Sequence, residues 1–227
     1  MLQNNMIKHL FCDVDGTLTA SRSKITKEMK RAISLLEQDI VFISGASYDQ
    51  MVFQLDNYTG LYMAQNGNDF LNYWKNEIED PSEIYDHIHS LRPTHSFVDY
   101  DGPDDMVENR GSQISLSMIG HHAPLEIKKA YDPGKKKRKA LLKEFPFKSD
   151  KFEVVIAGTT CFDYFLKGMN KGANIKRLIA LRNWRSDECL YVGDSLFKGG
   201  NDYSVVGVIP TKKVKDENET LLFINGL

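Results

Sequence analysis

Short apolar runs alternate with helical patterns over the first third of the chain. The runs have the length of buried strands and end in polar or glycine-containing sequence, and they cover residues 8–14, 40–43 and 61–64. Between the first two runs, apolar residues recur at helical spacing behind the potential N-cap Thr26. A second helix is predicted over residues 48–55. Strands and helices that alternate in this way predict a parallel α/β sheet.

The middle of the chain has a different pattern. A short helix is predicted after Pro81, and residues 114–118 alternate apolar and serine positions as a half-exposed strand does. A charged helical stretch follows, and residues 152–156 and 161–166 have the pattern of an antiparallel pair of strands. Residues 81–166 are therefore predicted to form a small inserted α+β domain, here called the cap.

The α/β pattern returns after the cap. Two helices and two strands are predicted there, with the helices at 172–181 and 214–223 and the strands at 190–192 and 208–210. These elements would complete the first sheet. The predicted fold is therefore a doubly wound, Rossmann-like α/β core, formed by residues 1–80 and 167–227, with the cap inserted between its two parts.

An acidic string, Asp13-Val14-Asp15-Gly16-Thr17, ends the first predicted strand. In open α/β sheets, ligands bind beyond the carboxyl ends of the strands. Asp13 and Asp15 are two positions apart on an extended strand, so their carboxylates point the same way and repel each other unless a cation lies between them. Mg²⁺ suits this place because it prefers oxygen ligands and substrate phosphate. The alternative is a strand-end turn in which Asp15 is merely solvated.

Two later segments could complete such a site. Ser44 and Gly45 follow the second strand, where a hydroxyl and backbone N–H groups suit a phosphate, although an ordinary turn has the same sequence. Asp194 ends a later strand and is the expected further metal ligand. Asn201 and Asp202 could hold the water shell of the metal. These last residues equally fit a glycine-rich loop with a helix-capping aspartate.

Lys171 opens a predicted helix and could neutralise a developing phosphoryl charge, although a lone lysine there is also common on a solvated surface. In chain order, the string at Asp13, then Ser44, Lys171 and Gly193-Asp194, resembles the four motifs of the haloacid dehalogenase (HAD) superfamily. The resemblance is to its Cof-like subclass, whose cap is inserted between the second and third motifs. It implies that Asp13 is a nucleophile and Asp15 an acid–base. It also implies that the Asp13 carboxylate, the Asp15 backbone carbonyl and Asp194 bind Mg²⁺.

The cap carries segments that resemble one family of this superfamily, the eukaryotic-type phosphomannomutases. Arg110 stands where that family has a substrate-binding arginine, and Cys161-Phe162-Asp163 resembles its Ser-Phe-Asp strand. His121 and Lys128 stand where the family has two more arginines. The resemblance implies that Arg110, His121, Lys128, Cys161 and Asp163 bind the sugar phosphate. The hold on a second phosphate would be weaker, because lysine lacks the bidentate fork of arginine and histidine is only partly charged.

This change in the cap favours a sugar-phosphate phosphatase, in which water takes the phosphoryl group. The alternative is a phosphomannomutase, which returns the phosphoryl group to another hydroxyl and so interconverts mannose 1-phosphate and mannose 6-phosphate. A third hypothesis, a catalytically silent binding protein on the same fold, is disfavoured because every expected catalytic residue is present. The mutase resemblance also implies a possible homodimer formed through the cap.

Composition and charge limit the classes of molecule that the protein is expected to bind. The formal net charge of -2 provides no field toward nucleic acid or an anionic membrane. No apolar run approaches the roughly 20 residues that span a bilayer. Residues 1–6 are polar and lack the apolar region of a signal peptide, so we expect a cytoplasmic protein that acts on a small phosphorylated sugar. The basic run at 135–139, which includes Arg138, is interpreted as a solvated helix face.

Overall fold

The chain forms two compact units in the computed structural model, which describes residues 7–91 and 105–227. The first unit comprises residues 1–75 and 170–227, and the second comprises residues 76–169. Each boundary lies a few residues from the one expected from the sequence. Residues 1–6, on which the prediction about a signal peptide rests, lie outside the described residues, as do residues 92–104 of the predicted cap.

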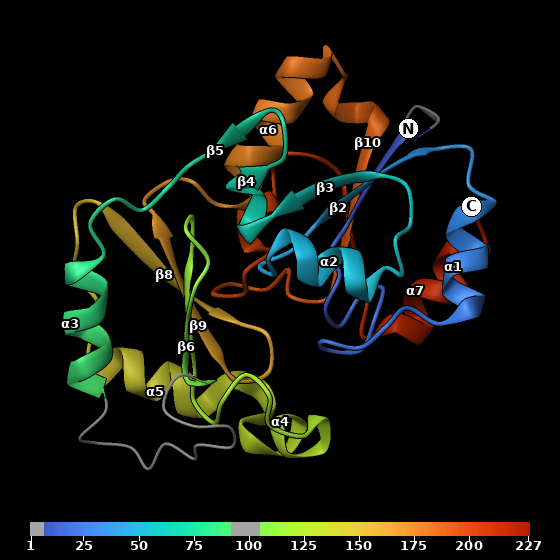
Figure 1. Cartoon of the computed structure of the whole chain (residues 1–227). Coiled ribbons are helices and arrows are strands. Elements are labelled where there is room, and N and C mark those ends of the chain that lie inside the picture. The colour runs from blue at the N-terminus through green and yellow to red at the C-terminus, as the bar shows by residue number, and fades with distance from the viewer. Residues whose placement is uncertain (1–6, 92–104) are drawn as a thin grey trace. The chain divides into compact units, whose positions relative to one another are not determined.

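The first unit is built on a seven-stranded sheet with the order β11-β10-β1-β2-β3-β4-β5 (Figure 1). Its strands are β1 (His9–Cys12), β2 (Asp39–Ile43), β3 (Leu61–Ala64), β4 (Asp69–Phe70), β5 (Trp74–Lys75), β10 (Cys189–Gly193) and β11 (Thr211–Lys213). The pairs from β11 through β3 are parallel, and β4 and β5 extend the sheet as an antiparallel edge. The predicted doubly wound α/β core is confirmed.

Helices bury both faces of this sheet. The cluster on one face joins Leu10, Cys12 and Phe42 to helices α1 (Lys27–Ser34), α2 (Tyr48–Gln54) and α7 (Glu217–Ile224). The cluster on the other face joins Phe11 and Val41 to helix α6 (Lys171–Arg182). Alternate residues of one strand thus enter opposite layers, which is why the sequence shows continuous apolar runs. As predicted, Thr26 caps α1, since its hydroxyl accepts from the Met29 amide at 3.1 Å.

The last strand of the core was predicted three residues too early. In the apolar sequence 208–210, Val208 lies in a turn and its amide donates to the Val205 carbonyl at 2.9 Å, while Ile209 makes only an isolated bridge with Val206. Pro210 has no N–H to give to a ladder, although its carbonyl accepts from Tyr191. The strand therefore begins at Thr211, immediately after the proline.

The second unit is a four-stranded antiparallel sheet with helices packed on it. The sheet order is β6-β7-β9-β8, formed by β6 (Val107–Asn109), β7 (Ile114–Ser117), β8 (Phe152–Ala157) and β9 (Cys161–Leu166). Its helices are α3 (Ser82–Leu91), α4 (Leu125–Tyr131) and α5 (Lys136–Glu144). The predicted half-exposure of β7 is wrong, because Ser115 and Ser117 are both buried. Their hydroxyls bond to Asp163 and Thr160, so the serine side of the strand is a packed polar layer.

Arg138 corrects the interpretation of the basic run. Its side chain is fully buried and pairs with the buried carboxylate of Asp132 at 2.9 Å. It also donates to three carbonyls of the turn between β8 and β9, those of Ala157, Gly158 and Cys161. The neighbouring lysines Lys136 and Lys137 are exposed, so the run is solvated except for the arginine that anchors this turn.

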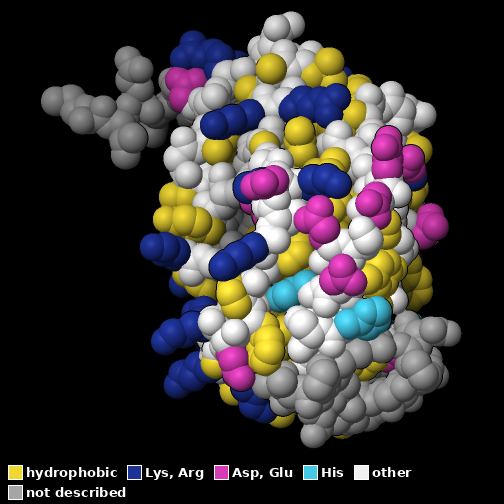
Figure 2. All heavy atoms as spheres, turned by 90° about the vertical axis from the view of Figure 1, so that its left-hand side faces the viewer, with side chains coloured by type: hydrophobic (Ala, Val, Ile, Leu, Met, Phe, Trp, Pro, Cys, Tyr) yellow, Lys and Arg dark blue, Asp and Glu magenta, His cyan; other side chains and the backbone are white. Residues whose placement is uncertain are grey.

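The surface carries charges of both signs. On the face drawn in Figure 2, acidic side chains lie among the lysines and arginines. Within the described residues, none of the helices combines the length and apolar character that a membrane span requires.

Candidate active site

Asp13 and Lys171 form the centre of the candidate site. Asp13 follows β1 directly, and its amide donates to the Val192 carbonyl of β10, which fixes the backbone at the carboxyl end of the sheet. Lys171 is the first residue of α6, whose N-cap Asn170 accepts from the Ala173 amide. The Lys171 ammonium donates to Asp13 Oδ1 at 2.7 Å and to Asp202 Oδ1 at 2.8 Å. The predicted solvated alternative for Lys171 is wrong, since its side chain is fully buried.

Asp194 brings a third carboxylate to this place. Carboxylate oxygens of Asp13, Asp194 and Asp202 lie within 4.8 Å of one another. Two glycines leave room for them. A Cβ on Gly16, which has φ of +80°, would lie 3.4 Å from the Asp194 carboxylate, and a Cβ on Gly193 would lie 2.5 Å from Asp202 Oδ2. The chain around the cluster is therefore shaped to let the carboxylates approach one another.

The cluster is short of positive charge. Burial raises the pKa of Asp13 well above its usual range, and the nearby Asp202 and Asp194 add to this against the opposing pull of Lys171. Burial alone would lower the pKa of Lys171, but the carboxylates of Asp13 and Asp202 outweigh it and raise that pKa. Three carboxylates therefore face one ammonium, and a bound cation would offset the excess negative charge.

This donor set fits a hard divalent cation. Mg²⁺ favours carboxylate oxygens, and the excess of acidic groups supplies the charge that it would balance. Asp13 and Asp194 were predicted as ligands, and Asp202 was predicted only in the surrounding shell, but its carboxylate lies in the cluster itself. Asn201, predicted beside it, is half-buried. Asp202 also pairs with Lys171, so it is shared between the cation position and the ammonium.

Asp15 is held by a residue that the sequence did not indicate. Gln54, the last residue of α2, is fully buried, and its side-chain amide donates to Asp15 Oδ1 at 3.0 Å and to Thr19 Oγ1 at 3.2 Å. The backbone amide of Arg22 donates to the same oxygen of Asp15 at 2.7 Å. Among the described residues, Asp15 is not one of the carboxylates that cluster with Asp13. A buried glutamine at a helix end has no sequence signature, because glutamine is an ordinary helix residue.

Ser44 lies at the carboxyl end of the neighbouring strand β2. It is buried, and its hydroxyl oxygen accepts from the Ala46 amide at 3.1 Å across Gly45. The parallel pairing of β1 with β2 matches Cys12 with Phe42, which brings the ends of both strands to the same edge. Ser44 and Gly45 therefore stand where the sequence predicted phosphate-binding groups.

A second residue that the sequence did not indicate, Tyr191, contacts the cluster through its hydroxyl. The Tyr191 hydroxyl donates to Asp202 Oδ1 at 2.6 Å and lies 3.3 Å from Lys171 Nζ. In the sequence, Tyr191 is one apolar residue of a buried strand, and nothing distinguishes it from its neighbours.

The second unit carries a row of polar side chains across its sheet. Glu108, Ser115 and Asp163 are partners in the strand register from β6 through β7 to β9. The Ser115 hydroxyl donates to Asp163 Oδ1 at 2.7 Å. Burial raises the pKa of Asp163 in spite of the nearby Arg110. This row lies on the face opposite the apolar cluster that contains Phe162 and Tyr164.

The cations predicted to bind substrate lie around this row. Arg110 donates through Nε to Glu108 Oε2 at 3.0 Å, and its side chain is nearly buried. His121 is buried, with Nδ1 3.7 Å from Glu108 Oε1 and Nε2 3.1 Å from the Ser115 carbonyl. Lys128 is also buried and donates to the His121 carbonyl. Cys161 is half-buried beside Thr160. The structure thus brings Arg110, His121 and Asp163 together, each with protein partners.

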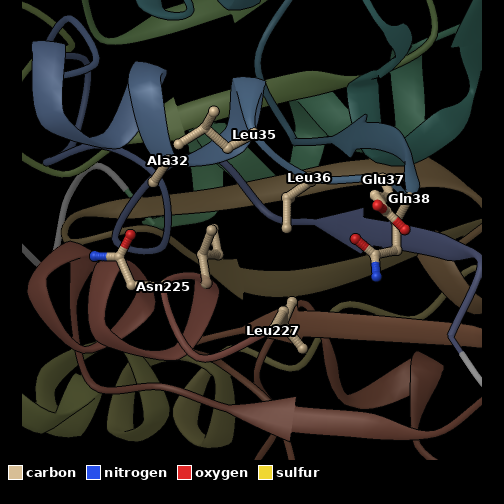
Figure 3. Close-up of a pocket in the computed structure, with 8 residues that line it drawn as sticks. Ala32, Leu35, Leu36, Glu37, Gln38, Asn225 and Leu227 are labelled. Carbon is tan, nitrogen blue, oxygen red and sulfur yellow. The ribbon is translucent and has the colours of Figure 1, made fainter.

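A hollow at the surface of the first unit is unrelated to this chemistry. It has a volume of about 320 Å³ and is lined by the connection from α1 to β2 and by the chain end, including Leu35, Gln38 and Leu227 (Figure 3). Leu35 and Gln38 lie in the segment that enters β2 at its amino end, so the hollow lies toward the opposite edge of the sheet from Asp13.

No family profile matches the chain. It is 28% identical to phosphomannomutase 2 of Dictyostelium discoideum, over 99% of this chain and 98% of that protein. It is 27% identical to the phosphomannomutase of Encephalitozoon cuniculi, over 85% of this chain and 82% of that protein.

Solved structures share the fold. A haloacid dehalogenase-like hydrolase from B. subtilis superposes with a TM-score of 0.67 at 16% identity, covering 97% of this chain and 99% of that one. An IMP-bound IMP-nucleotidase from Plasmodium falciparum superposes with a TM-score of 0.66 at 14% identity, covering all of this chain and 70% of that one. The expected resemblance is therefore confirmed: the fold is that of the HAD superfamily, and the sequence is phosphomannomutase-like.

Proposed function

We propose that this HAD-family phosphotransferase transfers the phosphoryl group of a small sugar phosphate through a covalent aspartyl-phosphate on Asp13. The observation that carries the proposal is the arrangement around Asp13. Its carboxylate lies 2.7 Å from a fully buried ammonium and within 4.8 Å of two more carboxylates. Phosphoryl transfer requires a nucleophile, a fixed positive charge and carboxylates that can bind a metal ion, because catalysis rests on positioning and electrostatics.

The chain's own groups account for the two half-reactions. An oxygen of Asp13 attacks phosphorus, the bond from phosphorus to the sugar oxygen breaks, and Asp15 gives that oxygen a proton. Asp15 then takes a proton from the incoming hydroxyl or water, which attacks phosphorus and releases Asp13. Gln54 and the Arg22 amide hold the Asp15 carboxyl for both transfers. Lys171 remains charged and faces the transferred group, with Ser44 and the backbone of Gly45 at the adjacent strand end.

Mg²⁺ is the proposed cofactor. Asp13 and Asp194, together with Asp202, would hold it, and it would neutralise charge on the phosphate oxygens. The Asp15 carbonyl remains a proposed further ligand.

The sugar is proposed to contact the polar row of the second unit. Asp163 and Ser115 offer a carboxylate and a hydroxyl of the kind that recognises sugar hydroxyls, and Arg110, His121 and Lys128 add positive charge nearby. Cys161 lies on the same strand face as Asp163. If Asp163→Ala left the KM for every sugar phosphate unchanged, this part of the proposal would fail.

Two reactions fit this chemistry, and the mutase now has the stronger support. The relatives that match over 85–99% of the chain are phosphomannomutases, which favours interconversion of mannose 1-phosphate and mannose 6-phosphate. One structural observation favours the phosphatase. Arg110 is engaged by Glu108, and Lys128 by the His121 carbonyl, so a second phosphate would have to compete for both cations.

Phosphorus NMR separates the two reactions. Purified protein is incubated with Mg²⁺ and mannose 1-phosphate, with and without a catalytic amount of glucose 1,6-bisphosphate. A mannose 6-phosphate signal that depends on the bisphosphate is expected for the mutase, and inorganic phosphate alone is expected for the phosphatase. Asp13→Asn serves as the control. Product formed at the wild-type rate by this variant would refute the aspartyl-phosphate.

A further inference from the structure

The Tyr191 side chain spans two environments. Its ring lies in the apolar cluster between the sheet and α6, beside residues such as Phe11 and Ile175. Its hydroxyl is fully buried and reaches the polar side, where it donates to Asp202 Oδ1 at 2.6 Å and lies 3.3 Å from Lys171 Nζ. Burial and the neighbouring Asp202 raise the pKa of Tyr191 well above its usual range, so the hydroxyl keeps its proton.

The direction of each hydrogen bond follows from the number of protons. A tyrosine hydroxyl has one proton, and the short bond gives it to Asp202. Its oxygen can therefore only accept from Lys171. An ammonium has three protons, and Lys171 has three acceptors, namely Asp13, Asp202 and Tyr191. Lys171, Asp202 and Tyr191 thus form a closed ring of hydrogen bonds that fixes the rotation of the ammonium.

This ring has a distinct value during phosphoryl transfer. When an oxygen of Asp13 bonds to phosphorus, the Asp13 carboxylate loses its negative charge, and the leaving sugar oxygen takes up that charge together with the proton from Asp15. The charged phosphoryl oxygens, now bonded beside Asp13, then replace its carboxylate as the acceptor of this Lys171 hydrogen bond. The other two N–H groups of Lys171 keep their hydrogen bonds to Asp202 and Tyr191. Because the Lys171 side chain is fully buried, solvent is poorly placed to replace a lost acceptor. The hydroxyl therefore holds Lys171 aimed at the reacting group in both states.

We propose that Tyr191 is a positioning residue for phosphoryl transfer, which acts by aligning Lys171 through Asp202. The inference rests on the proposed function. It differs from a purely structural role, for which Tyr164 gives the comparison. Tyr164 is also a fully buried tyrosine on a strand, but its hydroxyl bonds to His87 within the second unit.

The test compares Tyr191→Phe with Tyr164→Phe, each of which removes one buried hydroxyl. Turnover of p-nitrophenyl phosphate is measured with saturating Mg²⁺. For Tyr191→Phe we expect kcat to fall roughly 10- to 100-fold with KM unchanged, the size expected for one buried hydrogen bond to a charged group. Tyr164→Phe should lose stability without this fall in kcat.

A binding measurement separates positioning from folding. Orthovanadate adopts the five-coordinate geometry of the transition state, whereas inorganic phosphate resembles the product. By calorimetry on the Mg²⁺-loaded protein, Tyr191→Phe should weaken vanadate binding by about the same factor as kcat and leave phosphate binding unchanged. Tyr191→Met, which also keeps apolar bulk without the hydroxyl, is the second variant if the first does not fold.

The outcomes separate the two proposals. An active wild-type protein whose kcat and vanadate affinity are unaltered in folded Tyr191 variants would overturn the role of Tyr191 and leave the proposed function standing. Equal weakening of vanadate and phosphate would also overturn it, because a general disturbance of the site would then explain the loss. A wild-type protein that neither hydrolyses a phosphate ester nor interconverts mannose 1-phosphate and mannose 6-phosphate would overturn the proposed function, and the role of Tyr191 with it.

Discussion

Lys171 and Asp13 are 158 positions apart in the chain, and their side chains meet at 2.7 Å. Between them in sequence lies the whole of the second unit. The contact forms because β1 is central in the sheet and pairs with both β2 and β10, while α6 packs on one face of these strands. Lys171, the first residue of α6, therefore lies at the end of β1. The ion pair thus exists only when both parts of the discontinuous unit have assembled.

Removing the charge of Asp13 should abolish turnover without harming the fold. Asp13→Asn keeps the shape of the side chain but cannot form the phosphoryl ester, so we expect kcat to fall by at least about 10³-fold. Because burial raises the pKa of Asp13, the site disfavours the ionised form, and a neutral amide should leave the metal-free protein at least as stable. Thermal unfolding followed by circular dichroism checks the second expectation. A variant that unfolds more easily would contradict it.

Gln54 should matter for rate more than for binding. Gln54→Leu removes the amide that donates to Asp15 and Thr19, so the carboxyl of Asp15 is less well aimed. We expect kcat to fall about tenfold with little change in KM, the cost of one charge-assisted hydrogen bond. Gln50→Leu is the matched control, since Gln50 reaches Gln54 but not Asp15. Equal losses in the two variants would show that α2 as a whole, and not the contact to Asp15, is responsible.

The sequence predicted the parts of the site that are carried by strand ends. A carboxylate or serine at the end of an apolar run marks the edge of a parallel sheet, which is why Asp13, Ser44 and Asp194 could be placed in advance. The buried polar residues that bond to these groups could not be predicted in this way. Tyr191 occupies a position that any large apolar residue would satisfy, and its role depends on where its hydroxyl ends, which periodicity does not specify.

The same limit explains the errors in the second unit. Arg138 lies in a run of lysines, and its burial follows from the Asp132 carboxylate and from three carbonyls of a distant turn that need a donor. Ser115 alternates with apolar residues as a solvent-facing residue would, but the face it occupies is covered by other polar groups. Alternation identifies two faces of a strand, and it does not say whether the polar face meets water.

Asp194 should control metal affinity. In Asp194→Asn the cluster keeps Asp13 and Asp202 but loses one formal charge, so Mg²⁺ affinity should fall at least about tenfold. Calorimetric titration of the metal-free protein with MgCl₂ measures this directly. Asp187→Asn, at an exposed carboxylate paired with Arg185, is the control and should bind as the wild type does. An unchanged affinity in Asp194→Asn would move the cation site away from this cluster.

Arg138 should be a principal source of stability in the second unit. Arg138→Met leaves the buried carboxylate of Asp132 without its ion pair and three turn carbonyls without a donor. We expect a loss of about 3–5 kcal/mol in the free energy of unfolding of this unit, measured by urea titration. Lys136→Met, at an exposed neighbour, should change it by less than about 0.5 kcal/mol. Similar losses in both variants would contradict the anchoring role.

His87 should make the stability of the second unit depend on pH. The Phe145 carbonyl can only accept, so Nε2 of His87 carries a proton, and Nδ1 accepts from the Tyr164 hydroxyl. This is the neutral imidazole, and burial lowers its pKa below the ordinary 6.5. The unfolded chain therefore binds more protons in acid, so this stabilisation is complete above pH 6.5 and is lost as the pH falls through the lowered pKa.

The measurement is the urea midpoint of the second unit at pH values from 7.5 down to 5. His87→Gln keeps a donor toward Phe145 and an acceptor toward Tyr164 but cannot titrate, so its midpoint should fall less on acidification than that of the wild type. His89→Gln, at an exposed position of the same helix, should keep the wild-type slope. If His87→Gln lost stability as steeply as the wild type, another group would have to carry the acid sensitivity, and the neutral His87 would not be its source.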